Sequence, residues 1–183
     1  MQHTLIIYST TDGQTRKICE RLAQSFDSSK LLSVANVANE KISKYDQIVI
    51  GASIRYGKHQ PAVYQFIEKN RALLDRKKTA FFSVNVVARK PEKSAPENNP
   101  YMQKFLELSG WKPGLLAVFA GRLNYPQYRF LDKLMIRLIM YMTKGPTDTS
   151  QTYEFTNWAK VDEFASILAE QKISVLSEHD NMQ

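Results

Sequence analysis

Seven residues between an apolar run and a helical pattern have the composition of a phosphate-binding loop. Residues 9–15 (STTDGQT) follow the apolar run 5–8 and carry four hydroxyl side chains and one glycine. These hydroxyls and the first backbone N–H groups of the next helix would surround one point, where the helix adds partial positive charge. The loop lacks the Gly-Lys-Ser/Thr ending of a P-loop and the G-x-G-x-x-G of a dinucleotide site. It predicts a site for a phosphate monoester, with an ordinary helix N-cap as the alternative.

Two later loops could flank a flat ring. In residues 51–59 (GASIRYGKH), glycines allow close backbone approach, Tyr56 could stack on a ring, and Arg55 could bind an anion beside it. In residues 83–93 (SVNVVARKPEK), Asn85 or the nearby backbone could bond the polar edge of the ring, with three basic side chains around the mouth. The alternatives are a solvent loop with an incidental tyrosine and a solvated run of charges.

The basic charge of the chain is concentrated in two stretches. The 183 residues carry 25 Lys and Arg against 18 Asp and Glu, a net charge of +7. Residues 89–93 hold three basic and one acidic side chain, and residues 122–145 hold five basic and one acidic. A localised basic surface implies an anionic partner, such as a carboxylate, a phosphate or an acidic lipid. We expect no nucleic-acid binding, because these stretches lack the interleaved aromatic residues of a stacking surface.

The composition excludes several classes of protein. With 43% hydrophobic and 23% charged residues, the chain has ordinary globular usage. One cysteine excludes an intrachain disulfide and favours a reducing compartment, and with three scattered histidines it predicts no metal site. No apolar run reaches the length of a transmembrane helix, and the first ten residues do not resemble a signal peptide. We interpret His59 as a surface-loop residue, with a role as a proton carrier as the alternative.

Short apolar runs alternate with helical patterns along the chain. We expect strands near residues 5–8, 31–37, 47–52, 79–87 and 115–120. The alternation predicts an α/β fold with a parallel sheet covered by helices on both faces. Ligands of such folds bind outside the carboxyl ends of the strands, which is where the loops above lie. We expect a single domain over residues 1–175 and a C-terminal tail over 176–183.

Residues 122–150 interrupt this alternation. They separate the apolar run 115–120 from the strand-like segment 152–155, so we expect an insertion that splits the fifth strand. Within it, residues 129–144 place eight large apolar side chains on about half of a helix and the charged ones on the other side. The pattern is typical of a helix at a membrane interface, with a core-packing helix as the alternative. We expect its apolar face to meet a bilayer, a partner chain or the substrate.

The loop 9–15 resembles the phosphate loop of the flavodoxin family, and the resemblance extends over essentially the whole chain. It implies a flavodoxin-like three-layer sandwich with a five-stranded parallel sheet of order 2-1-3-4-5, and FMN as the cofactor. The cofactor-binding residues that it implies are Ser9, Thr10, Thr11, Asp12, Gly13, Gln14, Thr15, Ala52, Ser53, Ile54, Arg55, Tyr56, Ser83, Val84, Asn85 and Gly121.

Three longer strings resemble a narrower family over about residues 4–170. GASIRYG (51–57), SVNVVARKPEK (83–93) and AGRLNYPQYRFLDKLMIRLIM (120–140) are similar to segments of the flavodoxin-like, quinone-dependent protoporphyrinogen IX dehydrogenases of γ-proteobacteria. This resemblance implies an oxidoreductase of haem biosynthesis. The substrate would be protoporphyrinogen IX, oxidised in three two-electron steps, and the acceptor a membrane quinone, either menaquinone or ubiquinone.

The same resemblance implies a peripheral protein at the cytoplasmic face of the inner membrane, with the flavin supplying the chemistry and no obligatory acid or base. A homo-oligomer is left open. The residues that could bind the substrate are Arg89, Lys90, Arg122, Tyr125 and Arg129. The alternative functions are a flavodoxin-type electron carrier and an NAD(P)H:quinone reductase.

Overall fold

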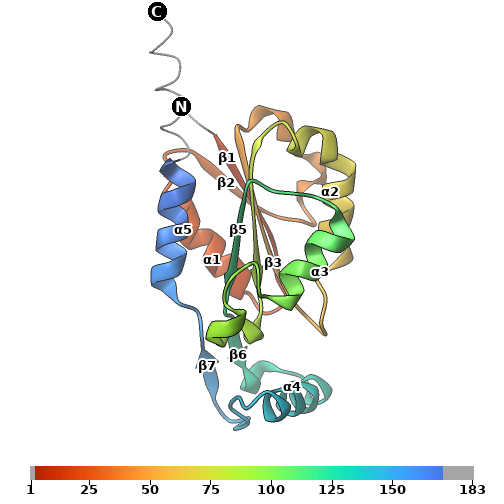
Figure 1. The fold of residues 1–183 in the computed structure, drawn as a ribbon, viewed down its shortest axis with the longest axis vertical. Coiled ribbons are helices and arrows are strands. Elements are labelled where there is room, and N and C mark those ends of the chain that lie inside the picture. Colours follow the sequence, from red (N-terminus) through yellow and green to blue (C-terminus); the bar gives the residue numbers. More distant parts are fainter. Residues whose placement is uncertain (1–2, 171–183) are drawn as a thin grey trace, which may run out of the picture.

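A computed structural model describes residues 3–170 and places five parallel strands in one sheet (Figure 1). The strand order is β2-β1-β3-β4-β5, which confirms the predicted order 2-1-3-4-5. The strands are β1 (Thr4–Ser9), β2 (Ser29–Ser33), β3 (Gln47–Ser53), β4 (Lys78–Val84) and β5 (Leu115–Phe119). The central strands are buried on both faces, as expected for short apolar runs in a parallel sheet.

Two helices cover each face of the sheet and complete the predicted three-layer sandwich (Figure 1). The helices α1 (Gln14–Ala23) and α5 (Trp158–Glu170) pack on one face, and α2 (Pro61–Leu74) and α3 (Pro100–Ser109) on the other. Local chemistry fixes the ends of α3. The Asn99 side chain accepts two N–H groups of the first turn, and Gly110 ends the helix in the left-handed region, at φ 57°.

An apolar layer fills each side of the sheet. One cluster includes Phe81, Phe105 and Trp111 under α2 and α3, and the other includes Phe82, Phe119 and Phe164 under α1 and α5. Cys19 on the inner face of α1 is fully buried in the second cluster, and burial raises the pKa of its thiol. The expected tail 176–183 lies outside the described residues.

Short 3-10 turns join several of these elements. They span Val37–Asn39, Ile42–Lys44, Val86–Arg89, Pro91–Lys93 and Tyr125–Gln127. Because the turn Val86–Arg89 follows it, β4 ends at Val84 and not at residue 87 as predicted. The Asn85 side chain accepts the N–H of Ala88 and so holds the backbone in the turn.

The insertion does not split the fifth strand, and this expectation is corrected. The segment β7 (Thr152–Glu154) pairs antiparallel with β6 (Arg122–Asn124) in a separate two-stranded ribbon. Because β4 has already ended at Val84, the chain beyond β5 has no neighbour left in the main sheet, and its backbone groups pair with the returning chain. The insertion therefore follows β5.

The helix of the insertion, α4 (Phe130–Met142), lies across the carboxyl ends of the strands (Figure 1). Met140 is its fully buried residue and packs with Leu123 and Tyr125 of the insertion. Within residues 3–170, no helix has the length and hydropathy needed to cross a membrane.

Candidate functional site

A cleft of about 480 Å³ lies between the carboxyl ends of the strands and α4. It receives residues from all the loops in which the sequence predicted ligand contacts. The predicted cofactor residues that line it are Thr10, Asp12, Gln14, Thr15, Ser53, Ile54, Arg55, Tyr56, Val84, Asn85 and Gly121. Of the residues predicted to bind the substrate, Arg89 and Arg122 line it.

The other predicted residues lie beside the cleft or away from it. Ser9, Thr11, Gly13, Ala52 and Ser83 belong to the same loops and strand ends but do not form its lining. Lys90, Tyr125 and Arg129 also lie outside the lining. Tyr125 is buried beneath α4, where its hydroxyl donates to the Pro146 carbonyl at 2.9 Å.

One end of the cleft has the features of an anion site. No side chain caps the N-terminus of α1, because the N-cap residue is Gly13. The N–H of Gly13 itself donates to Thr10 Oγ1 at 3.0 Å. Gly13 adopts φ 82° with open space around it. Among the buried side-chain oxygen and nitrogen atoms of residues 3–170, Thr15 Oγ1 is the one that has no hydrogen-bond partner. Free helix N–H groups beside an unpaired hydroxyl fit a phosphate better than an ordinary N-cap.

The side chain of Gln14 holds this loop to the insertion. Its Nε2 donates to Glu154 Oε1 at 2.8 Å and to Thr156 Oγ1 at 2.9 Å. Thr156 in turn donates to the Ala120 carbonyl at 2.9 Å. The Gln14 amide nitrogen therefore positions the start of α1 against the chain that returns from β7.

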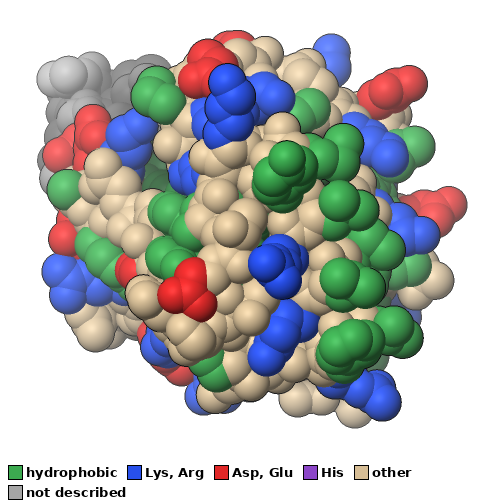
Figure 2. Space-filling model, turned by 90° about the horizontal axis from the view of Figure 1, so that it is seen from below, with side chains coloured by type: hydrophobic (Ala, Val, Ile, Leu, Met, Phe, Trp, Pro, Cys, Tyr) green, Lys and Arg blue, Asp and Glu red, His purple; other side chains and the backbone are tan. Residues whose placement is uncertain are grey.

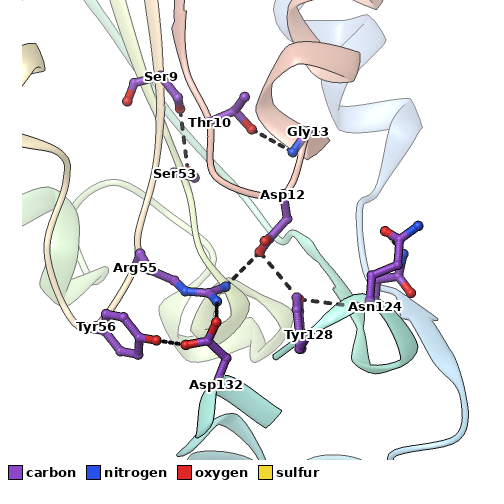
Figure 3. Close-up of polar contacts among 11 residues, drawn as sticks. Ser9, Thr10, Asp12, Gly13, Ser53, Arg55, Tyr56, Asn124, Tyr128 and Asp132 are labelled. Carbon is purple, nitrogen blue, oxygen red and sulfur yellow. Dashed lines mark hydrogen bonds and ion pairs between the residues drawn. The ribbon is translucent and has the colours of Figure 1, made fainter. Parts of the chain in front are cut away.

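A charged cluster spans the middle of the cleft (Figure 3). The Arg55 guanidinium forms ion pairs with Asp12 and with Asp132 of α4, both at 3.0 Å. The Tyr128 hydroxyl donates to Asp12 at 3.4 Å, and the Tyr56 hydroxyl donates to Asp132. Burial raises the pKa of Asp12, although Arg55 opposes the shift. Arg55, which the sequence suggested as a partner for an anion, is therefore already paired with two carboxylates.

The side chain of Asn85 is engaged within the protein. Its Oδ1 accepts from Ala88 N–H and Asn99 Nδ2, and its Nδ2 donates to Ser83 Oγ at 3.1 Å. The Ser83 hydroxyl also bonds His59 Nε2 at 3.0 Å. This network fixes the shape of the loop after β4.

The interpretation of His59 as a surface residue is wrong. The ring is 2% exposed and sits edge-on to Tyr64, Phe81 and Phe105. Burial lowers its pKa to about 4, so it is neutral near pH 7.

The opposite wall of the cleft is apolar and comes from α4. Met135, Ile136, Ile139 and Met140 line it. Met135 and Ile139 remain 48% and 42% exposed, whereas Met140 is buried. The cleft therefore joins a polar end suited to phosphate with an apolar end suited to a hydrophobic molecule.

The guanidinium groups of the three arginines that line the cleft differ in the hydrogen bonds and ion pairs that they make. Arg55 is paired with two carboxylates, and Arg89 donates to the Val86 carbonyl and to both oxygens of Thr143. The Arg122 guanidinium has neither a hydrogen bond nor an ion pair within residues 3–170, although it is near enough to Asp12 to act against the rise in the pKa of that carboxyl. Arg122 is therefore the cleft arginine available to an anionic ligand.

The sequence analysis expected the apolar face of the insertion helix to meet the substrate, a bilayer or a partner chain, but it named no residue of α4 itself as part of the site. The missed residues that line the cleft are Gly57, Val86, Val87, Tyr101, Leu123, Tyr128, Met135, Ile136, Ile139, Met140 and Thr143. A signal for the wall did exist. Asp132, Ile136 and Met140 recur every four residues and define the inward face of α4.

Comparisons with known proteins identify the family. Residues 5–150 match the family model described as Flavodoxin domain. The protoporphyrinogen IX dehydrogenase (quinone) of Escherichia coli strain K12 is 45% identical to this chain over 170 residues, covering 91% of this chain and 94% of that protein. The protein of the same name from Leishmania major is 38% identical, covering 93% of this chain and 76% of that protein.

A solved structure extends the likeness of the fold. Rubredoxin oxygen:oxidoreductase from Desulfovibrio gigas superposes with a TM-score of 0.51 at 13% identity, over 92% of this chain and 35% of that one. The predictions of the flavodoxin-like fold, of FMN and of an oxidoreductase are confirmed by the family. The chain belongs to the flavodoxin-domain family and, within it, to the FMN flavoprotein oxidoreductases named protoporphyrinogen IX dehydrogenase (quinone).

Proposed function

We propose that this chain oxidises protoporphyrinogen IX to protoporphyrin IX in haem biosynthesis and passes the electrons to a membrane quinone, menaquinone or ubiquinone. The names of relatives at 45% and 38% identity support the substrate and the acceptor. The observation that carries the proposal is the joining, in one cleft, of an anion-binding loop and the apolar wall of α4. An electron carrier has no need of such a wall.

The residues of the cleft fit FMN. Thr10, Thr15 and the free N–H groups at the start of α1 would hold the phosphate, since the Thr15 hydroxyl is buried without a partner. Tyr56, which is exposed in the cleft, would contact the ring from the loop after β3. When bound, FMN supplies the acceptor for two electrons at a time.

Arg122 would bind a carboxylate of the substrate. Protoporphyrinogen IX is a large apolar ring system with two propionates, so it needs both an apolar wall and a cation. Arg122 lines the cleft and is not paired within the described chain, and guanidinium groups bind carboxylates in a bidentate manner. Met135 and Ile139 of α4 would contact the ring system. Arg89, with its hydrogen-bonding nitrogens directed to Val86 and Thr143, would contribute charge at a greater distance.

The outward face of α4 would rest on the cytoplasmic face of the inner membrane. Phe130, Leu131, Leu134, Leu138, Tyr141 and Met142 are exposed large hydrophobic residues on this one helix. Basic side chains lie beside this apolar surface on the same face of the molecule (Figure 2). Apolar side chains would enter the acyl boundary while Lys133 and Arg137 meet anionic headgroups. A quinone dissolved in the bilayer would then reach the cleft along α4.

The overall reaction balances with three quinones. Each step removes two hydrogen atoms from the macrocycle and converts one quinone to one quinol. One protoporphyrinogen IX and three quinones therefore give one protoporphyrin IX and three quinols. The protein residues bind and orient the ring system and hold its carboxylate; none is required to act as an acid or a base.

Anaerobic turnover of protoporphyrinogen IX tests the proposal. We expect porphyrin fluorescence to rise when a quinone is present and not when it is replaced by NAD or NADP. Rapid flavin reduction by NADPH or NADH, at the rate of quinone reduction, would instead establish an NAD(P)H:quinone reductase. Turnover absent with every quinone, together with rapid exchange of electrons with a redox protein, would establish an electron carrier.

A further inference from the structure

The turn after β3 has an unusual backbone that its own sequence does not explain. Arg55 and Lys58 form an isolated antiparallel bridge, with hydrogen bonds of 3.0 and 3.3 Å between their backbones. The two residues between them, Tyr56 and Gly57, have φ of 50° and 78°. This region suits glycine, but a tyrosine adopts it rarely. The backbone hydrogen bonds and Gly57 support the turn from within, and contacts of the Tyr56 side chain with other parts of the chain can offset the cost of its positive φ.

Asp132 provides those interactions from another part of the chain. It lies in the first turn of α4, and its side chain is 24% exposed, although Leu131 beside it is almost fully exposed. One carboxylate oxygen pairs with Arg55 Nη2 at 3.0 Å, and the other accepts the Tyr56 hydroxyl. Asp132 thus binds both side chains of the turn, and Arg55 also lies over the Tyr56 ring at 5.3 Å (Figure 3).

The cluster also has a net charge. Arg55 carries one positive charge, and Asp12 and Asp132 each carry a negative one, so these three side chains together are anionic when both carboxylates are ionised. The nearby Arg122 offsets part of this charge at Asp12. Asp12, Arg55 and Tyr56 line the cleft, so this charge lies where the cofactor is proposed to bind. At partly buried positions such charges are screened less than at an open surface.

We propose that Asp132 is a positioning residue of the flavin site, which sets the orientation of Tyr56 and the net negative charge of the Arg55 cluster. This rests on the proposed binding of FMN in the cleft. Asp132 acts through Arg55 and Tyr56 and need not touch the cofactor. Because Asp132 belongs to the insertion, α4 contributes to the properties of the flavin as well as to the apolar wall.

Two substitutions separate the effects of charge and of geometry. Asp132→Asn keeps the shape and an oxygen that can accept the Tyr56 hydroxyl but removes the negative charge. A reduced flavin that carries negative charge is then repelled less, so we expect the midpoint potential of the bound flavin to become more positive. Asp132→Ala also releases Tyr56, and we expect FMN to dissociate about tenfold more readily, as for loss of a hydrogen bond to a charged group.

Asp162→Asn is the matched control. Asp162 pairs with Arg21 at 2.7 Å between α5 and α1, away from the cleft lining, so its loss should leave the potential and the FMN dissociation constant unchanged. In a chain that already carries Tyr56→Phe, Asp132→Ala should weaken FMN binding less than it does in the wild-type chain. The hydrogen bond between Tyr56 and Asp132 is then already absent, so it cannot be lost a second time.

Potentiometric titration and fluorescence titration with FMN give the result directly. A potential and a dissociation constant in both Asp132 variants equal to those of Asp162→Asn would overturn the inference. A wild-type chain that binds no FMN would contradict the proposed function itself, and this outcome is distinguishable from the first. A melting temperature within the range of the control establishes that the variants remain folded.

Discussion

Arg89 caps the C-terminal end of α4 by donating from one nitrogen to both oxygens of Thr143, at 2.9 and 3.0 Å. Another guanidinium nitrogen donates to the Val86 carbonyl at 3.1 Å. Burial lowers the pKa of Arg89, because the partly desolvated site disfavours the cation. Arg89 thus joins the loop after β4 to the insertion, which leaves Arg122 as the proposed partner of a substrate carboxylate.

We therefore expect Arg122→Gln to raise KM for protoporphyrinogen IX about tenfold or more with a smaller change in kcat, because a charged hydrogen bond to bound substrate is lost. Steady-state kinetics at fixed quinone measure this. Arg76→Gln, which removes one exposed positive charge after α2, should leave both constants unchanged. Equal effects of the two substitutions would show that only net charge matters and would count against Arg122 as the carboxylate partner.

Replacing the unpaired Thr15 hydroxyl should affect the free and the FMN-bound protein in opposite directions. Thr15→Val keeps the shape and removes a buried polar group without a partner, so the protein without FMN should gain about 1 kcal/mol in unfolding free energy. FMN binding should weaken by about 1–2 kcal/mol, since the hydroxyl no longer meets the phosphate. Denaturant unfolding and fluorescence titration measure the two quantities.

Thr15→Ser keeps the hydroxyl and is the control for Thr15→Val. It should retain most of the FMN affinity. If Thr15→Val binds FMN as tightly as Thr15→Ser does, the phosphate does not meet this hydroxyl.

The exposed face of α4 should govern binding to vesicles. Leu134 and Leu138 are 57% and 55% exposed, and we expect Leu134→Ser with Leu138→Ser to lower partition into anionic vesicles about tenfold or more. Leu108→Ser is the matched control, because Leu108 is 61% exposed but belongs to α3. Sedimentation with vesicles at rising salt should also show weaker binding, since ions screen the attraction of Lys133 and Arg137 to headgroups. Unchanged partition of the double variant would exclude α4 as the membrane contact.

The burial of His59 predicts a loss of stability in mild acid. Its pKa is lowered to about 4 in the folded protein, against about 6.5 when unfolded, so the unfolded chain takes up the proton first. The contribution to stability is complete above pH 6.5 and falls as the pH drops toward 4, by roughly 3 kcal/mol.

His59→Phe should remove this part of the pH dependence, because the buried site then has no group to protonate. Denaturant unfolding at pH 7, 5.5 and 4 measures it, with His3→Gln as the control for the loss of an exposed histidine. An acid slope in His59→Phe as steep as in the control would mean that other groups cause it.

The features that the sequence predicted are those that depend on local composition. Residues 9–15 are adjacent in the chain, and the apolar runs of β1 and β3 are complete within a few residues, so neither needed knowledge of distant contacts. The ion pair of Arg55 with Asp132 depends on where α4 docks, and no periodicity encodes that position. The same reason applies to the β6–β7 ribbon, which forms because β4 ends at Val84. The burial of His59 follows from the packing of Phe81 and Phe105 around a loop that reads as polar.

The position of α4 between the cleft and the exterior limits how its sequence can vary. Leu131 and Met142 face outward, and any apolar residue of similar size should serve there. Met140 is confined by close packing, because even a Cβ added at Gly145 would meet its side chain. Met135 and Ile139 line the cleft and are partly exposed. In a saturation mutagenesis scan of α4, substitutions should therefore be tolerated best at Leu131 and Met142, less well at Met135 and Ile139, and least at Met140. Selection for a different hydrophobic substrate should change Met135 and Ile139 first.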